Sequence, residues 1–332
     1  MSVACGANTM RILVIKLSSL GDLFHALPAV HCLKAGLGAT IDWAVNAEYA
    51  DLVRCFTDVD RVIRFHRHGF FRNLRVFLGE LRRNDYDYVV DFQGLLKSAM
   101  VARFARGRRR VGPSFHREGS RLFYHEVAGE RNRSRHAVEE NLDAIRHLEL
   151  PVLEPQFPVS VPEWETTMPA PRVAIVPSSR WQSKNWPVES FIAVGRKLWD
   201  NAAASMFVLG SVADMPVCAQ VQEALGARVE NMAGRLSVVE MCSVLARMDL
   251  VISNDSGPMH AAAALGVPVL AVFGPTDPLK TGPYGRWHHV KCASLPCRPC
   301  FERVCRFGEP RCLNVVTPDE AAKVALEMLK KP

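Results

Sequence analysis

Short apolar runs alternate along this chain with longer segments in which apolar residues recur every three or four positions. The short runs are typical of buried strands, and the longer periodic segments are typical of amphipathic helices. Strands that alternate with helices indicate an α/β protein with largely parallel sheets. In the first half, the pattern predicts strands at 11–17, 40–45, 61–65 and 86–91, and helices at 23–35, 47–56, 70–83 and 95–105.

A proline-rich segment interrupts this alternation. Six prolines lie within residues 150–172, and such a density favours an extended connector. At 332 residues the chain exceeds what one hydrophobic core usually supports, so we expect a domain on each side of the connector. In the second half, strands are predicted at 173–176, 205–209, 250–253 and 267–273, and helices at 188–199, 217–225, 238–246 and 261–265.

The expected organisation has four parts. An N-terminal domain covers residues 1–155, a linker covers 156–171, and a second domain covers 172–315. A final helix within 316–332 is expected to pack back on the N-terminal domain. Each domain is predicted to be a doubly wound, Rossmann-like unit. Because ligands of such sheets bind beyond the carboxyl ends of the strands, we expect the site in a central cleft between the two domains.

The composition narrows the class of protein. Hydrophobic residues make up 48% of the chain and the mean hydropathy is +0.02, which predicts a soluble globular protein. The longest apolar runs are too short to span a bilayer, and the first ten residues are too weakly apolar for a secretory signal. Ten cysteines without such a signal predict reduced thiols and a cytoplasmic location.

The net charge of +7 is divided unevenly. Residues 1–150 carry 23 basic and 17 acidic residues, whereas the remainder carries 18 and 17. Most of the excess lies within residues 97–135, which contain eleven basic residues against three glutamates. A solvated basic face is one interpretation. An anionic partner is the other, such as nucleic acid, a membrane surface or an acidic substrate.

Two polar turns in the second half are suited to phosphate. Residues 254–260 read Asn-Asp-Ser-Gly-Pro-Met-His, between an apolar run and an alanine-rich helix. The start of a helix collects unpaired N–H groups and a partial positive charge, so a small turn there is a natural phosphate site. A similar turn, Phe-Gly-Pro-Thr-Asp-Pro, follows the next predicted strand at 273–278. Two such sites suggest a nucleotide diphosphate.

Another polar turn follows the first predicted strand. Residues 16–22 read Lys-Leu-Ser-Ser-Leu-Gly-Asp and precede the first predicted helix. One glycine is too few for the dinucleotide fingerprint, so the turn is a weak match to an NAD site. Asp22 could cap the helix. Alternatively, its carboxylate could act as a general base that takes a proton from a sugar hydroxyl.

Together these turns resemble those of a known family. The motifs at 16–22, 91–98, 178–187, 254–260 and 273–278 match glycosyltransferase family 9 in content and order, over residues 11 to 325. That family consists of bacterial ADP-heptose transferases of lipopolysaccharide core assembly, with the GT-B fold of two Rossmann-like domains. The first two motifs are most similar to the heptosyltransferase I branch. The Asn-Asp-Ser-Gly run instead resembles the heptosyltransferase II branch.

The resemblance implies an inverting transfer from ADP-L-glycero-D-manno-heptose that requires no cofactor. Asp22 is the implied general base, and Lys184 is the implied cation beside the leaving diphosphate. A solvated surface lysine is the alternative for Lys184, and a packed helix histidine is the alternative for His260. The implied donor-binding residues are Ser178, Ser179, Lys184, Asp255, Ser256, Gly257 and His260, with Thr276 and Asp277 as neighbours and Asp214 as the nearest acidic candidate for the ribose.

The implied acceptor is the Kdo-lipid A of the lipopolysaccharide inner core. Its carboxylates and phosphates suit bidentate guanidinium groups. The basic first domain would also hold the enzyme on the anionic inner face of the bacterial inner membrane. Helix 70–83 could dip into that interface with its phenylalanines, although core-facing aromatics explain such a pattern more often. The expected acceptor-binding residues are Ser19, Gln93, Lys97, Arg117 and Arg121.

Four cysteines form the remaining cluster, at Cys297, Cys300, Cys305 and Cys312. The first pair has the spacing of a zinc knuckle, and four thiolates could hold structural zinc or iron. The second pair is spaced irregularly, so reduced structural thiols are the alternative. We expect no metal requirement from the family resemblance.

Three other functions remain open from the sequence. A GT-B-like nucleotide-sugar epimerase would share the two-domain build without needing a basic acceptor surface. A nucleic-acid-binding module would use the basic run, but no aromatic-interleaved recognition motif accompanies it, so no nucleic acid partner is expected. A metal-dependent interaction protein would depend on the cysteine cluster.

Overall fold

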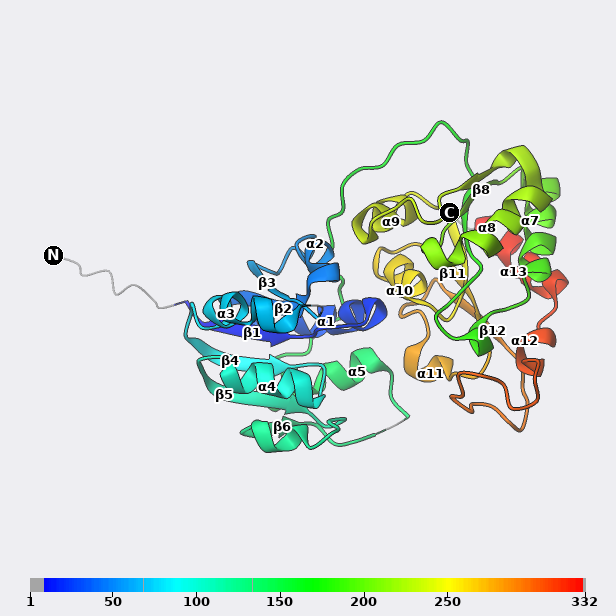
Figure 1. Cartoon of the computed structure of the whole chain (residues 1–332). Coiled ribbons are helices and arrows are strands. Elements are labelled where there is room, and N and C mark those ends of the chain that lie inside the picture. The colour runs from blue at the N-terminus through cyan, green and yellow to red at the C-terminus, as the bar shows by residue number, and fades with distance from the viewer. Residues whose placement is uncertain (1–8, 68, 133, 331–332) are drawn as a thin grey trace. The chain divides into compact units, whose positions relative to one another are not determined.

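The computed structural model describes residues 9–67, 69–132 and 134–330. The chain divides into two compact units, Met1–Ser160 and Val161–Pro332. Their boundary falls inside the linker predicted at 156–171. Figure 1 shows a parallel sheet flanked by helices in each unit. No helix of the described residues combines the length and apolar character needed to cross a membrane.

The first unit contains one six-stranded parallel sheet in the order β3-β2-β1-β4-β5-β6. Its strands are β1 (Arg11–Ile15), β2 (Thr40–Asn46), β3 (Arg61–Phe65), β4 (Tyr86–Asp91), β5 (Gly107–Pro113) and β6 (Glu126–Ala128). Its α-helices are α1 (Leu20–Leu37), α2 (Ala50–Val53), α3 (Phe70–Leu81), α4 (Leu96–Phe104), α5 (Ala137–Asn141) and α6 (Asp143–His147), with short 3₁₀ helices η1 (Ala47–Tyr49) and η2 (Ser120–Phe123).

Strand β1 forms the centre of this sheet. Ile12 pairs in register with Ile41 of β2 on one side and with Tyr88 of β4 on the other. The four residues from Ile12 to Ile15 are fully buried, because helices cover both faces of a parallel sheet. This explains why β1 is a continuous apolar run with no polar alternation. The turn 16–22 follows the last residue of β1 and therefore lies at the carboxyl edge of the sheet.

Strand β5 was not predicted, because three successive arginines hide its strand character. Arg109 pairs with Glu126 of β6 at 2.6 Å, and Arg108 pairs with Asp87 of β4 at 3.4 Å. Opposite charges on adjacent strands stabilise the pairing modestly. Part of the basic run at 97–135 therefore stabilises the edge of the sheet, while the rest remains outside these ion pairs.

The second unit repeats the architecture, with strand order β12-β11-β10-β7-β8-β9 and all strands parallel. Its strands are β7 (Arg172–Val176), β8 (Ser205–Val208), β9 (Val229–Asn231), β10 (Leu250–Asn254), β11 (Val269–Phe273) and β12 (His289–Cys292). Its helices are α7 (Val188–Ala202), α8 (Met215–Leu225), α9 (Val238–Leu245), α10 (Gly257–Ala264), α11 (Pro278–Thr281), α12 (Arg311–Asn314) and α13 (Pro318–Leu329), with 3₁₀ helices η3 (Gln182–Lys184), η4 (Val212–Asp214) and η5 (Gly226–Arg228).

Both sheets have the strand order of a Rossmann fold, in which the chain starts at the centre and the two halves wind outwards in opposite directions. The direction reverses between β1 and β4 in the first unit, and between β7 and β10 in the second. Loops at the carboxyl ends of these strand pairs diverge and leave room for a ligand. These two switch points are therefore where the chemistry of each unit is expected.

The last helix contributes to the core of the second unit. The apolar face of α13 packs within that core. Ala321 and Ala325 are fully buried there, and Asp319 pairs with Lys197 of α7 at 3.0 Å. The indole N–H of Trp186 also donates to the carbonyl of Val316, just before the helix. Residues 316–330 are thus an integral part of the second unit.

Candidate functional site

In the first unit, side chains cross-link the loops after β1 and β4 at the switch point. The Gln93 side-chain carbonyl accepts hydrogen bonds from the backbone N–H groups of Leu17 and Ser18, both at 3.1 Å. The ammonium of buried Lys16 donates to the carbonyl of Phe92 at 2.7 Å. Gln93, predicted to bind a sugar, therefore also fixes the shape of the turn that carries Asp22.

Asp22 lies in the first turn of α1. Its Oδ2 accepts hydrogen bonds from the backbone N–H of Ser19 at 2.8 Å and from the Ser19 hydroxyl at 2.7 Å. This is the reciprocal half of a capping box, so the capping interpretation of Asp22 is confirmed geometrically. Among the described residues, Oδ1 accepts no such bond. Oδ2 is thus held in place by Ser19.

The surroundings of Asp22 favour its ionised form. Burial opposes ionisation, but the nearby charges of Lys16 and His25 and the hydrogen bonds from Ser19 lower the pKa of the carboxyl to about 2. The group is thus a carboxylate at neutral pH, able to accept a proton but unable to donate one. Lys16, which the motif contains but for which no role was predicted, contributes to this through its charge.

The loop after β4 is built on Asp91. This buried carboxylate accepts hydrogen bonds from the backbone N–H of Gln93 and Gly94 and from the Tyr124 hydroxyl at 2.7 Å. Burial raises its pKa despite these donors. Gly94 has a φ of 70°, and a Cβ there would lie 2.9 Å from Pro113, so only glycine fits this turn. Asp91 therefore acts as a structural anchor.

The turn at Gly94 also positions the predicted acceptor residues. The Gly94 carbonyl accepts hydrogen bonds from the backbone N–H of Arg117 at 2.8 Å and from the Ser120 hydroxyl at 3.0 Å. Arg117 and Arg121 are both exposed, as is Lys97, whose ammonium lies 5.0 Å from the centre of the Phe65 ring. These three cations are consequently attached to the same loop system as Gln93.

In the second unit, Asn254 performs the corresponding cross-link. Its side-chain N–H donates to the Pro177 carbonyl at 2.9 Å, and its side-chain carbonyl accepts from the backbone N–H of Trp186 at 3.0 Å. Asn254 is completely buried at the end of β10. It therefore joins the phosphate turn to the loop after β7. Its side chain was not predicted to have a role, although its place before Asp255 was a usable signal.

Three predicted donor residues meet beside this cross-link. The Lys184 ammonium lies 2.7 Å from Asp255 Oδ2, and the Thr276 hydroxyl donates to that same oxygen at 2.6 Å. The Lys184 ammonium also lies 4.5 Å from the centre of the Trp181 ring. Lys184 is thus not a freely solvated lysine. The loops after β7, β10 and β11 converge on one charged cluster.

The two predicted serines lie at the end of β7 but make different contacts. Ser178 donates a hydrogen bond to Asp214, and this bond, with those from Ser211, lowers the pKa of Asp214 although burial opposes it. Ser179 instead donates from its hydroxyl and its backbone N–H to the side-chain carbonyl of Asn185, at 3.0 and 2.7 Å. Asp214, which follows β8, therefore lies beside the end of β7.

The remaining predicted donor residues lie on two helices. Ser256 is the N-cap residue of α10 and Gly257 is its first residue, so their backbone N–H groups belong to the start of that helix. His260 is buried one turn inside α10. Asp277 caps α11 by accepting from the Leu279 N–H at 3.0 Å, which gives it a structural role in addition to the predicted one.

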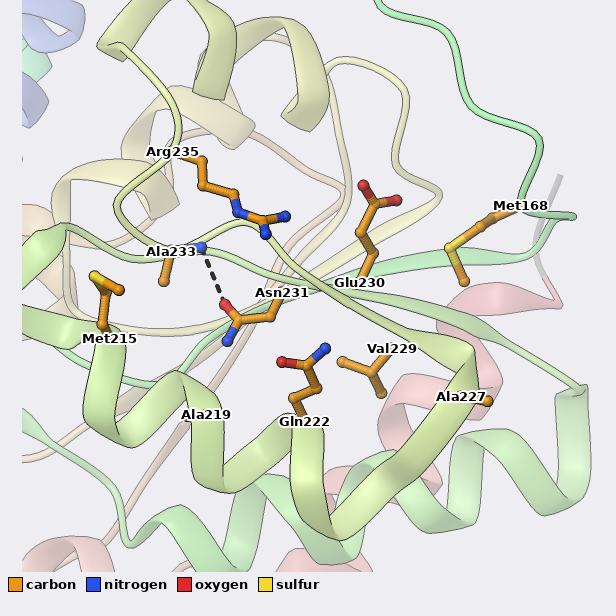
Figure 2. Close-up of a pocket in the computed structure, with 10 residues that line it drawn as sticks. All are labelled: Met168, Met215, Ala219, Gln222, Ala227, Val229, Glu230, Asn231, Ala233 and Arg235. Carbon is orange, nitrogen blue, oxygen red and sulfur yellow. Dashed lines mark hydrogen bonds between the residues drawn. The ribbon is translucent and has the colours of Figure 1, made fainter.

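A groove of about 440 Å³ lies elsewhere in the second unit, between α8 and β9. Figure 2 shows Gln222 on α8 facing Asn231 at the end of β9, with Met168 at the far side. The Asn231 side chain accepts from the Ala233 N–H at 3.0 Å. The groove lies along the edge strand and not at the switch point. The convergent polar groups around Lys184 therefore define the candidate site better than this groove.

The four cysteines line a single cavity of about 370 Å³ beside the Lys184 loop. Burial raises the pKa of the Cys312 thiol, and nearby Cys297 and Cys300 raise it further. In the part of the chain that the structure describes, however, no three His, Cys, Asp or Glu side chains are grouped to hold one metal ion. Of the two interpretations left open by the sequence, a grouped thiolate site is not formed among these residues.

The cysteine loop instead supports the loops around Lys184. The Arg298 guanidinium donates to the carbonyls of Gly274 and Thr276 in the loop after β11. The Ser183 hydroxyl donates to the Glu302 carbonyl at 2.6 Å, next to Lys184. Arg298 was not predicted to contribute, because nothing local in the sequence connects it with a loop more than twenty residues earlier.

Two Rossmann-like sheets, with polar switch points at the ends of β1 and β7, are the architecture of GT-B glycosyltransferases. Comparison with known proteins agrees with this class. The profile of glycosyltransferase family 9 (heptosyltransferase) matches residues 75–310. Lipopolysaccharide heptosyltransferase 1 of Pseudomonas aeruginosa is 31% identical over 365 residues, covering 97% of this chain and 99% of that protein. The chain therefore belongs to glycosyltransferase family 9 and is a glycosyltransferase.

Other relatives extend this result. Lipopolysaccharide heptosyltransferase 1 of Escherichia coli K12 is 30% identical over 83% of this chain and 92% of its own length. The solved structure described as E. coli heptosyltransferase WaaC with ADP matches with a TM-score of 0.80 and 26% identity, covering 96% of this chain and all of that one. The predicted α/β fold of the GT-B class is confirmed, and the epimerase, nucleic-acid and metal-dependent interaction alternatives are set aside.

Proposed function

We propose that this protein transfers heptose from ADP-heptose to the Kdo-lipid A acceptor of the lipopolysaccharide inner core. The observation that carries the proposal is the pair of polar switch points. One holds an oriented carboxylate, Asp22, and the other holds Lys184 paired with buried Asp255. An inverting sugar transfer needs a base for the acceptor hydroxyl and a cation for the departing diphosphate.

The donor assignment is supported by the groups gathered in the second unit. Lys184 offers an ammonium to the diphosphate, and the first N–H groups of α10 offer hydrogen bonds and a partial positive charge. Asp214, held by Ser178, is suited to accept from ribose hydroxyls. The related E. coli enzyme is described in complex with ADP-2-deoxy-2-fluoro heptose, a donor analogue, with 26% identity to this chain.

The proposed reaction is a single displacement. The acceptor oxygen forms a bond to the anomeric carbon while the bond from that carbon to the diphosphate oxygen breaks. The hydroxyl proton passes to Oδ1 of Asp22, and the charge that develops on the diphosphate is stabilised by Lys184. Ser19 holds Oδ2 so that the other carboxylate oxygen faces the acceptor. We propose that the transfer uses no bound cofactor.

The acceptor assignment is supported by the exposed cations of the first unit. Arg117 and Arg121, with Lys97, suit the carboxylates and phosphates of a Kdo acceptor. The same positive charge suits the anionic inner face of the inner membrane, so we propose that the protein acts there as a peripheral enzyme. The heptosyltransferase 1 relatives at 30 to 31% identity favour the first heptose transfer over the second.

The test is a transfer assay with purified protein, ADP-heptose and a deacylated Kdo acceptor, run in the presence of a chelator. We expect release of ADP and a product heavier by one heptose, detected by mass spectrometry. Other nucleotide sugars serve as competing donors, and an acceptor that already carries one heptose distinguishes the first transfer from the second. Turnover with another nucleotide sugar but not with ADP-heptose would contradict the donor assignment.

A further inference from the structure

Helix α4 presents an apolar stripe to solvent. Leu96, Met100 and Phe104 are spaced four residues apart, so they lie along one face of the helix, and each is about 40% exposed. Leu122 on the neighbouring η2 is 87% exposed, and α4 and η2 pack together. Four large apolar side chains are therefore exposed on two adjoining elements. We call these four residues the α4 surface.

Basic residues flank the α4 surface on both sides. Helical residues advance by about 100° each, so Lys97 and Arg103 fall on opposite flanks of the stripe. Arg106 follows the helix, Arg117 lies just before η2, and Arg121 is the second residue of η2. Among the described residues, these five cations form no salt bridge. Residues 96–122 contain eight basic residues and one acidic residue.

The single acidic residue does not offset this charge at the stripe. The Glu118 carboxylate accepts a hydrogen bond from the backbone N–H of Leu96 at 3.1 Å, at the start of α4. Its charge is thus engaged with the partial positive charge of the helix start. The α4 surface keeps a net positive rim around an apolar centre.

We propose that the α4 surface docks this protein onto an anionic lipid bilayer, an inference that rests on the proposed function. Apolar side chains with a basic rim match the two layers of such an interface, in which acyl chains lie beneath anionic headgroups. Nucleic acid would gain little from Leu96, Met100 or Leu122, since phosphates contact the rim alone. Arg121 shares η2 with Leu122, so a bilayer held here would bring a lipid-linked acceptor to the acceptor arginines.

Helix α3, predicted as the segment that could dip into the membrane, is less suited to that role. Phe77 is buried and packs edge-on against Phe65 with ring centres 5.1 Å apart, as the core-facing alternative expects. The side chains of Phe70 and Phe71 lie outside the described part of the structure. Among the described side chains of α3, Val76 is the exposed large apolar one, at 70%.

The experiment is co-sedimentation of the full chain with phosphatidylcholine vesicles, with and without phosphatidylglycerol. We expect binding to the anionic vesicles that weakens as salt rises. The double substitution Met100→Glu with Phe104→Glu should lower the partition coefficient at least about tenfold. Arg103→Gln should lower it about fivefold, as expected for one near-surface basic residue.

Two control variants separate this surface from others. Val76→Glu introduces the same charge on α3, and Leu279→Glu introduces it at an exposed position of the second unit. Both should bind vesicles as the natural protein does. All variants should transfer heptose to the deacylated, soluble acceptor at the wild-type rate, because none of the substituted residues is assigned to binding or catalysis.

The outcomes are distinguishable. The inference is overturned if the natural protein ignores anionic vesicles, if the Met100/Phe104 variant binds as strongly as the natural protein, or if Val76→Glu alone abolishes binding. Dimerisation through this surface would also overturn the inference. In that case the natural protein would be a dimer that does not bind vesicles, and the Met100/Phe104 variant would be a monomer. Vesicle binding that depends on the α4 surface, in a protein that transfers no heptose to the soluble acceptor, would support the surface and contradict the proposed function.

Discussion

The Lys184 ammonium lies 2.7 Å from the Asp255 carboxylate, which also accepts a hydrogen bond from Thr276. Lys184 is thereby held at the switch point of the second unit before any diphosphate arrives. A cation fixed by its own counter-ion loses less conformational freedom on binding than a solvated lysine. The pair thus gives a physical reason to expect that this lysine acts in diphosphate binding.

Replacing Lys184 with Ala should weaken ADP binding, because the diphosphate loses its charged partner. We expect the Kd for ADP to rise about thirtyfold, corresponding to about 2 kcal/mol for a charge-assisted hydrogen bond. Isothermal titration calorimetry measures this directly. Lys197→Ala, which breaks the α7–α13 pair with Asp319 instead, is the matched control. Equal Kd values for natural protein and Lys184→Ala would remove the cation assignment.

Replacing Gln93 with Leu should slow turnover without changing donor binding. The substitution removes the oxygen that accepts from the Leu17 and Ser18 N–H groups, so the turn carrying Asp22 loses its support. We expect kcat to fall at least about tenfold while the Kd for ADP is unchanged. Gln93→Glu keeps an acceptor oxygen and should retain more activity than Gln93→Leu. The opposite order would contradict a positioning role for that oxygen.

Charge reversal at Arg117 and Arg121 should act on the acceptor alone. With both residues changed to Glu, we expect the KM for the deacylated acceptor to rise at least about tenfold and to lose most of its salt dependence. Arg196→Glu on α7 applies the same charge change at an exposed site of the second unit. An acceptor KM that responds equally to both changes would indicate a general charge effect and not a binding site.

The low pKa of Asp22 predicts the acid side of the pH profile. Since the folded pKa of about 2 lies below the usual range, the ionised carboxylate stabilises the fold at neutral pH, and this contribution is lost as the pH falls towards 2. The rate of transfer should show no acid limb from Asp22 above about pH 4. Lys16→Met removes a charge that lowers this pKa, so a limb should move upwards in that variant. If the acid limb of the pH–rate profile has the same midpoint in the natural protein and in Lys16→Met, it reports the titration of a group other than Asp22.

Secondary structure was predicted correctly wherever the residues of a single segment were enough to identify a strand or helix. Strands β3 and β4 were predicted with their observed bounds, because each is a short segment rich in valine, isoleucine and aromatic residues between polar turns. Strands β6 and β9 have only three residues each, too few to show any periodicity, and the arginines of β5 resemble a solvated segment. These misses lie at or next to sheet edges, where burial no longer requires apolar residues.

For the site, the local turns were predictable and the links between them were not. The spacing of Ser19 and Asp22 already suggests a capping box, and the structure contains its reciprocal half. The contacts of Asn254 with Pro177 and of Arg298 with Gly274 join segments far apart in the sequence. Such links depend on the strand order of the sheet. That order cannot be predicted from the residues of any single segment.

The central claim is that Asp22 is the base, and the most direct measurement is the kcat of Asp22→Asn with ADP-heptose and soluble acceptor. Asparagine retains an oxygen that can accept from the Ser19 N–H, so the start of α1 is preserved while the base is lost. The account predicts a fall in kcat of at least about a hundredfold, with the Kd for ADP unchanged. A kcat close to that of the natural protein would contradict it.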